Sequence, residues 1–104
     1  MDRIAKLKAF LEQQPGDVFL SHALALEYEK ANDVAAAVQL FGSLLAQHPE
    51  ATGSYYHYAR LLAQSGEKEK ALEVYREGIT ACRAANDQHA LRELQAAYDE
   101  LADD

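Results

Sequence analysis

Residues 24–49 read LALEYEKANDVAAAVQLFGSLLAQHP, and much of this pattern returns 34 positions later in the chain. Pro15 and Pro49 are separated by the same 34 residues. Paired positions agree in kind, with alanine on alanine, apolar on apolar and turn residue on turn residue: Ala25 and Ala59, Ala37 and Ala71, Leu24 and Tyr58, Tyr28 and Leu62, Leu40 and Val74, Phe41 and Tyr75, Asn32 and Gly66. A fixed period of this length is typical of chains built from stacked helical units.

Each period predicts two helices joined by a turn. Asp17 can cap the first helix, Asn32-Asp33 separates it from the second, and Ser65-Gly66 provides the corresponding turn in the second period. Apolar residues recur every three or four positions, as on one helical face. They are Leu20, Ala23, Leu24, Tyr28 and Ala31, then Ala37, Leu40, Phe41, Leu44 and Leu45, then Tyr55, Tyr58, Ala59 and Leu62, then Ala71, Leu72, Val74, Tyr75 and Ile79.

Two further helices are expected at the ends of the chain. Residues 2–14 place Ile4, Leu7, Phe10 and Leu11 on one side. After the turn Asn86-Asp87, a last amphipathic helix carries Leu91, Leu94, Tyr98 and Leu101. The sequence therefore predicts an all-α chain of about six helices, in which the terminal two cover the ends of a short stack.

Composition limits the classes of function. Twenty alanines and only two prolines favour helices, and the net charge of −7 comes with no cluster of Lys and Arg, which argues against a nucleic-acid partner. The charged N-terminus does not resemble a secretory signal, and no apolar run reaches membrane-spanning length. Cys82 is the only cysteine. We therefore expect a reduced, cytoplasmic protein with no membrane partner.

These residues together resemble the tetratricopeptide repeat (TPR) family, whose helix–turn–helix units carry a leucine before a small residue, a tyrosine, an alanine, a phenylalanine and a closing proline. The first repeat, residues 18–51, supplies Leu24-Ala25, Tyr28, Ala37, Phe41 and Pro49. The second, residues 52–85, supplies Tyr55, Tyr58-Ala59, Gly66, Ala71 and Tyr75. The resemblance implies a single TPR-like domain over residues 1–104, a short right-handed α-solenoid of antiparallel hairpins. Residues 2–14 and 87–102 would act as N-terminal and C-terminal capping helices.

Four positions depart from the family pattern. Ser21 stands where a large aromatic residue is usual, and Leu44 and Gly78 replace a small alanine late in the second helix. We expect the glycine to be a mild change and the leucine a larger one. Arg83 replaces the closing proline of the second repeat, so we expect its second helix to continue to about residue 85.

The resemblance also implies a concave groove, lined by the first helices of the repeats, that receives a peptide or helix of a partner protein. The candidate groove residues are Phe19, His22, Leu26, Glu29, Tyr56, His57 and Arg60. Tyr56 and Arg60 are neighbours at i and i+4 and offer an aromatic surface and a guanidinium, which are common in binding hot spots. The Lys and Asn residues of the TPR clamp for chaperone-tail carboxylates are absent, which argues against that mode. Whether the last helix covers the groove stays open.

No constellation of residues points to catalysis or to a cofactor. The glycines are scattered singly, no nucleophile elbow occurs, and the four histidines lack metal-ligand spacing. A metal site at His22 and His57, with Glu29 as third ligand, would be needed for a metal-dependent enzyme, and this is the most distant alternative. The sequence favours a non-catalytic protein-interaction module without metal or cofactor. The first alternative is a scaffold that associates with itself, as a homodimer for example.

Overall fold

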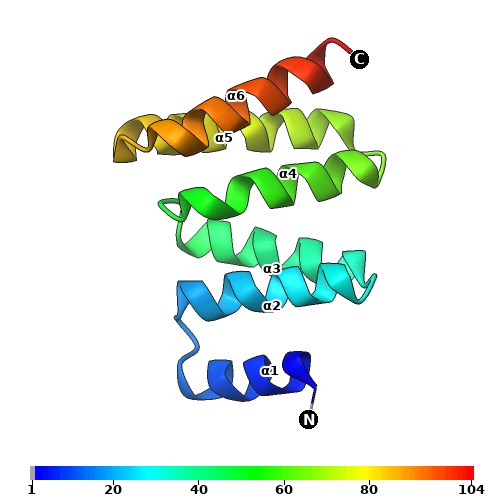
Figure 1. The fold of residues 1–104 in the computed structure, drawn as a ribbon, viewed down its shortest axis with the longest axis vertical. Helices are drawn as coiled ribbons and strands as arrows, with labels where there is room; N and C mark the ends of the chain where they lie inside the picture. Colours follow the sequence, from blue (N-terminus) through cyan, green and yellow to red (C-terminus); the bar gives the residue numbers. More distant parts are fainter. Residues whose placement is uncertain (1) are drawn as a thin grey trace. The chain divides into compact units, whose positions relative to one another are not determined.

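The computed structural model describes residues 2–104, and it is helical from end to end (Figure 1). The elements are α1 (Arg3–Gln13), α2 (Val18–Lys30), α3 (Val34–Gln47), the short 3-10 helix η1 (Thr52–Ser54), α4 (Tyr55–Gln64), α5 (Lys68–Ala85) and α6 (Gln88–Ala102). Residues 2–104 contain six α-helices and no strand. The predicted all-α helical repeat fold is confirmed, and α5 does continue to Ala85.

The helices form two compact units. One unit ends at His48 and contains α1, α2 and α3, with α2 packed against both of the others. The second runs from Pro49 to Asp104 and contains η1 and α4 to α6, with α5 packed against α4 and α6. Each unit is built around one helix hairpin of the repeat, α2–α3 and α4–α5.

The hairpin turns preserve the period of the sequence. Asn32 and Gly66, which are paired in the sequence, both take left-handed backbone angles, with φ of 65° and 87°. In each turn, the following amide donates to a carbonyl five residues earlier, from Asp33 to Tyr28 and from Glu67 to Leu62, both at 2.9 Å. Asn86 repeats this geometry between α5 and α6 with φ of 56°. The same helix-ending motif therefore closes α2, α4 and α5.

Aspartates begin several of the helices, as the sequence predicts. The carboxylate of Asp17 accepts from the amide of Leu20 at 2.9 Å at the start of α2. Asp33 and Asp87 cap α3 and α6 in the same way. These bonds satisfy amide groups that otherwise have no partner in the first turn of a helix.

The first unit has a small core between α2 and α3. Its buried residues on these helices are Leu24, Ala25, Ala37, Phe41, Leu44 and Leu45. Helix α1 adds only Leu7, and the guanidinium of Arg3 on α1 meets the Glu27 carboxylate of α2 at 3.2 Å. Phe10, which the sequence places on the same side of this helix as Leu7, remains 50% exposed. A lone helix packed on one neighbour cannot cover so wide an apolar face.

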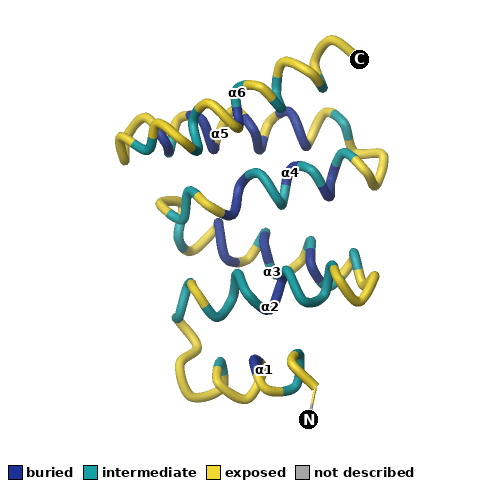
Figure 2. Tube along the Cα trace, viewed as in Figure 1, coloured by how far each residue is buried: buried dark blue, intermediate teal, exposed yellow. Residues whose placement is uncertain are grey.

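The second unit buries more of its apolar side chains, and buried positions recur along α4 and α5 (Figure 2). The buried residues of these helices include Tyr55, Ala59, Leu61, Leu62, Ala71, Leu72, Val74, Tyr75, Gly78, Ile79 and Cys82. Leu94 of α6 is only 1% exposed. In this unit, the aromatic position of the repeat is occupied by Tyr55, which is buried.

Gly78 is not the mild change that we expected from the sequence. A Cβ atom added at this glycine would lie 2.7 Å from Cβ and 2.8 Å from Cγ of Tyr55. It would also lie 2.9 Å from Cδ1 of Leu94. The absence of a side chain at residue 78 allows α4 and α5 to approach closely, with the Tyr55 ring between them.

Candidate functional site

A cleft of about 340 Å³ lies in the second unit, where α4, α5 and α6 meet. Helix α4 contributes four of its lining residues, α5 contributes Tyr75, and α6 forms the opposite wall. The complete lining is Tyr56, Arg60, Ala63, Gln64, Tyr75, Ala97, Glu100, Leu101 and Asp104. Two of the residues predicted to bind a partner, Tyr56 and Arg60, therefore lie in one concave site.

The helical period of α4 explains this placement. Tyr55 and Ala59 are buried, whereas Tyr56 and Arg60, one position later, are half-buried and turn to the cleft. His57 is half-buried too, and its ring meets the Tyr56 ring edge-on, with centroids 5.7 Å apart and an interplanar angle of 83°. His57 does not line the cleft and instead packs behind Tyr56.

Several contacts fix the α6 wall of the cleft. At its start, the Thr52 hydroxyl donates to the Asp87 carboxylate at 2.9 Å. Near its end, the Lys68 ammonium donates to the backbone carbonyl of Asp104 at 2.8 Å. Between them, the Arg76 guanidinium bonds the Tyr98 hydroxyl at 3.1 Å. The last helix therefore forms part of the site and is held at both ends.

The polar groups of the cleft differ in sign between its walls. Arg60 brings a positive charge on α4, and Glu100 and Asp104 bring negative charges on α6. Burial raises the pKa of the Tyr75 phenol, and neighbouring Tyr56 adds to the rise while Arg60 opposes it. Tyr75 is thus a neutral phenol at physiological pH. The cleft can offer an aromatic surface, a guanidinium and carboxylates to a bound chain.

The remaining predicted groove residues lie on α2, in the first unit. Phe19 is 76% exposed, while His22, Leu26 and Glu29 are half-buried. The His22 ring packs edge-on against Phe41, with centroids 5.7 Å apart and an interplanar angle of 69°. His22 therefore contributes to packing as well as to the surface. Phe19 is more exposed than Phe10, the other large apolar side chain that is exposed.

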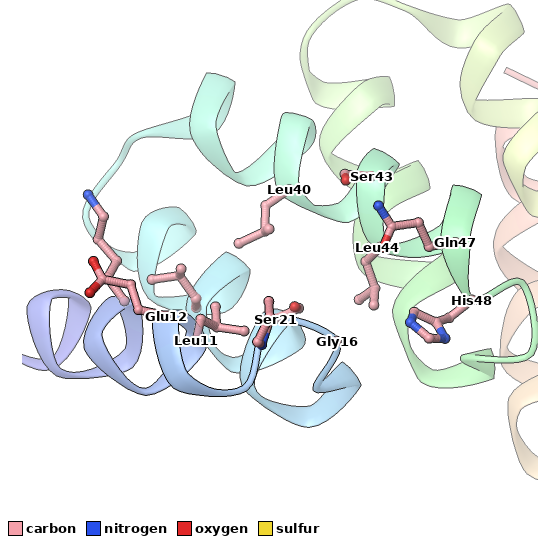
Figure 3. A pocket seen from close by; sticks show the side chains of 12 residues that line it. Leu11, Glu12, Gly16, Ser21, Leu40, Ser43, Leu44, Gln47 and His48 are labelled. Atoms are coloured by element: carbon pink, nitrogen blue, oxygen red, sulfur yellow. The ribbon is translucent and has the colours of Figure 1, made fainter.

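Sequence reasoning missed a second concave feature, a pocket of about 360 Å³ in the first unit (Figure 3). Its lining comes from α1, from the loop after it, and from α2 and α3. The residues are Lys8, Leu11, Glu12, Pro15, Gly16, Ser21, Leu24, Leu40, Ser43, Leu44, Gln47 and His48. The signal that could have indicated it is Ser21, the small residue in a position that is usually aromatic.

The chemistry of the described residues offers no metal centre, since no three His, Cys, Asp or Glu side chains among residues 2–104 are grouped to hold an ion. The proposed His22, His57 and Glu29 triad is not among such groups.

Burial raises the pKa of the Cys82 thiol, and the Asp87 carboxylate raises it further. Within residues 2–104, none of the helices combines the length and apolarity needed to cross a bilayer.

Two helix hairpins that recur with a 34-residue period define a helical repeat protein. The family model of the tetratricopeptide repeat matches residues 22–88. The chain belongs to the tetratricopeptide repeat family, and the resemblance seen in the sequence is confirmed. A comparison with curated proteins found no match.

Solved structures support the same conclusion. A tetratricopeptide repeat domain protein from Salinibacter ruber is 33% identical, with a TM-score of 0.80 over 84% of this chain and 88% of that one. A protein from Bordetella parapertussis is similar in fold at 22% identity, with a TM-score of 0.82 over 98% and 89% of the two chains. The TPR2B domain of yeast Sti1, solved in complex with pHsp70, gives 0.87 over 96% and 80% at 17% identity.

Proposed function

We propose that this protein is a non-catalytic interaction module, and that the α4–α6 cleft binds an extended or helical segment of a partner protein. The observation that carries the proposal is the combination of Tyr56, Arg60 and Tyr75 on one side of the cleft with Glu100 and Asp104 on the other. Aromatic rings and a guanidinium in a partly desolvated cleft are the groups that dominate binding energy in protein interfaces. The yeast neighbour in its complex with pHsp70 supports the general role, since it has the same fold.

The charges of the cleft favour a partner segment with a basic residue. Residues 86–104 carry six carboxylates against Arg92 alone, and two of these carboxylates, Glu100 and Asp104, line the cleft. A positive side chain near α6 would be attracted to them, while the aromatic rings of α4 and α5 would cover the apolar part of the segment. Association should therefore slow down as ionic strength rises.

The test compares affinity capture by the wild-type protein, a Tyr56→Ala/Arg60→Ala variant and a Glu69→Ala/Arg83→Ala control. Glu69 and Arg83 are exposed on α5 and do not line the cleft. We expect the first variant to keep its helical circular dichroism and lose the proteins that wild type and control retain after crosslinking. Equal capture by all three proteins would refute the cleft as the binding site. Loss of helicity in the first variant would show that the two side chains are part of the core.

Self-association is a second candidate function, and exposed Phe10 and Phe19 favour it. These side chains are 50% and 76% exposed, on α1 and α2 of the same unit. A second copy could cover them, as in scaffold proteins that pair through apolar surfaces. Light scattering of the wild type and of Phe10→Ser/Phe19→Ser decides the matter. A monomer at high micromolar concentration in both proteins would refute self-association.

A further inference from the structure

The two repeats fill one equivalent position in opposite ways. In the second repeat this position is Tyr55, whose ring is buried against Gly78 and Leu94. The residue 34 positions earlier is Ser21, and the residue 34 positions before Gly78 is Leu44. The second repeat therefore pairs a large residue, Tyr55, with a glycine. The first repeat has the reverse pair, the small Ser21 and the large Leu44.

The residues around Tyr55 show which residues of the first repeat correspond to its binding place. Its hydroxyl donates to the Pro49 carbonyl at 2.6 Å. Burial raises the pKa of the Tyr55 phenol most, and Glu77, Cys82 and Glu50 raise it further. By the 34-residue period, these three residues together with Pro49 and Gly78 correspond in the first repeat to Ser43, His48, Gly16, Pro15 and Leu44.

All five of these corresponding residues, and Ser21 itself, line the 360 Å³ pocket of the first unit. Figure 3 shows Leu11, Leu40 and Leu44 around the hollow, with Ser21 and His48 at its margin. Leu44 lies in the core and is only 4% exposed, so it has taken up part of the space but has not filled it. By this correspondence, the pocket is equivalent to the place that the Tyr55 ring takes in the second repeat.

We infer that this pocket binds the side chain of a tyrosine presented by a segment of a partner protein, a site separate from the α4–α6 cleft and independent of the function proposed for it. The apolar walls match the ring, as the walls around Tyr55 do. Pro15, which lines the pocket, corresponds in the sequence to Pro49, whose carbonyl accepts the Tyr55 hydroxyl, and Ser43 and His48 add polar groups. The volume is at the lower end of that of pockets for small ligands, about 300 to 1,000 Å³.

The rim of the pocket favours a polypeptide over a free phenol. Lys8 and Glu12 of α1 and Gln47 of α3 line the opening and are exposed. They provide a cation, an anion and an amide, which can bond the backbone and the polar side chains on either side of a bound tyrosine. A small phenol would contact the walls only and would leave these rim groups in water.

The experiment titrates ¹⁵N-labelled protein with three probes and follows the amide resonances by NMR. The probes are acetyl-Gly-Tyr-Gly-amide, acetyl-Gly-Leu-Gly-amide and p-cresol. We expect the tyrosine peptide to shift the amides of Ser21, Leu40, Ser43 and Leu44, and to bind at least tenfold more tightly than the other two probes. Shifts confined to the α4–α6 cleft, or none at millimolar peptide, would overturn the inference. Equal affinity for p-cresol would also overturn it, because the pocket would then bind a free phenol.

Filling the pocket from within supplies the matched variants. Ser21→Tyr places the missing ring and should weaken the tyrosine peptide at least tenfold, whereas Ala46→Tyr, at an exposed position of α3 outside the pocket, should not. If circular dichroism shows that Ser21→Tyr does not fold, Ser43→Tyr at the exposed edge of the pocket takes its place. Unchanged affinity in the folded blocking variant would contradict the assignment. The Ser21 amide resonance of the peptide-free protein is also followed on dilution. A change in its position would indicate that a second copy of the protein occupies the pocket, and would contradict the assignment as well.

Discussion

Replacing Gly78 by alanine should destabilise the protein, although the same change usually stabilises a helix. In an exposed helix, alanine is favoured over glycine by about 1 kcal/mol, because glycine loses more backbone entropy on folding. At residue 78 the new methyl group would lie 2.7 Å from Cβ of Tyr55, and 2.9 Å from Cδ1 of Leu94. Real Cβ atoms do not approach so closely, so α4 or α6 must move away from α5.

The magnitude follows from these two opposing effects. Overpacking of a close-packed core costs about 1 to 3 kcal/mol, and the contact with Cβ of Tyr55 cannot be relieved by a change of its rotamer. We take about 3 kcal/mol, the upper end of that range, because the new methyl group would meet three atoms at once. These are Cβ and Cγ of Tyr55 and Cδ1 of Leu94. After subtraction of about 1 kcal/mol for helix propensity, the net loss of unfolding free energy is about 2 kcal/mol.

Urea unfolding followed by circular dichroism measures this loss as a shift of the midpoint at constant slope. The control is Gly53→Ala, because a Cβ at Gly53 meets nothing within 4 Å and should change the unfolding free energy by less than about 0.5 kcal/mol. A double-mutant cycle adds Tyr55→Ser/Gly78→Leu, which copies the Ser21 and Leu44 pair. We expect the double variant to lose less unfolding free energy than the sum of the losses in the two single variants. A stabilising Gly78→Ala, or additive changes, would refute the close approach of α4 and α5.

Further predictions concern other contacts of the fold. The Asp87 pKa is lowered by the Ala90 amide and then by the Thr52 hydroxyl, so its carboxylate stabilises the fold at neutral pH. That stabilisation is lost as pH falls below 3.8 through the lowered folded-state value. The urea midpoint of Asp87→Asn should therefore change less between about pH 5 and about pH 3 than that of wild type. Cys82, buried and with a raised pKa, should react with Ellman's reagent only after denaturant unfolds the chain, and fast labelling of native protein would contradict its burial. Asn32→Ala should lower the unfolding free energy by about 1 kcal/mol because φ is 65°, whereas Asn32→Gly should not, as measured by urea unfolding.

Much of the fold could be predicted because the same turn and apolar positions occur twice in the sequence, 34 residues apart. The 34-residue spacing, the turn residues Asn32 and Gly66 and the capping aspartates all appear as such in the structure. Even the long α5 follows from a single missing proline at Arg83. These features depend on backbone preferences and on the helical period, which a sequence displays directly.

The site could be predicted only in part. Helical period separates Tyr56 and Arg60 from the buried side of α4, but it does not reveal that α6 supplies Glu100 and Leu101 to the opposite wall. That arrangement depends on tertiary contacts such as the one between Thr52 and Asp87.

The pocket of the first unit was missed for a similar reason. Ser21 and Leu44 each depart from the family pattern, and each alone suggests a small defect in packing. Only the structure shows that the second repeat has the reverse pair, Tyr55 and Gly78, in direct contact. The same comparison explains why Gly78 is needed where a sequence pattern treats glycine and alanine as equivalent.

Site-specific photo-crosslinking can show whether a partner segment binds in the α4–α6 cleft. The photoreactive residue p-benzoylphenylalanine would replace Gln64, an exposed residue that lines the cleft, and in a control Glu73, an exposed residue of α5 outside it. Crosslinked products would be identified by mass spectrometry in cells that express each protein. We expect one dominant partner joined at residue 64, absent from the control and lost when Arg60→Ala is added. The same products from both positions, or none at residue 64, would contradict it.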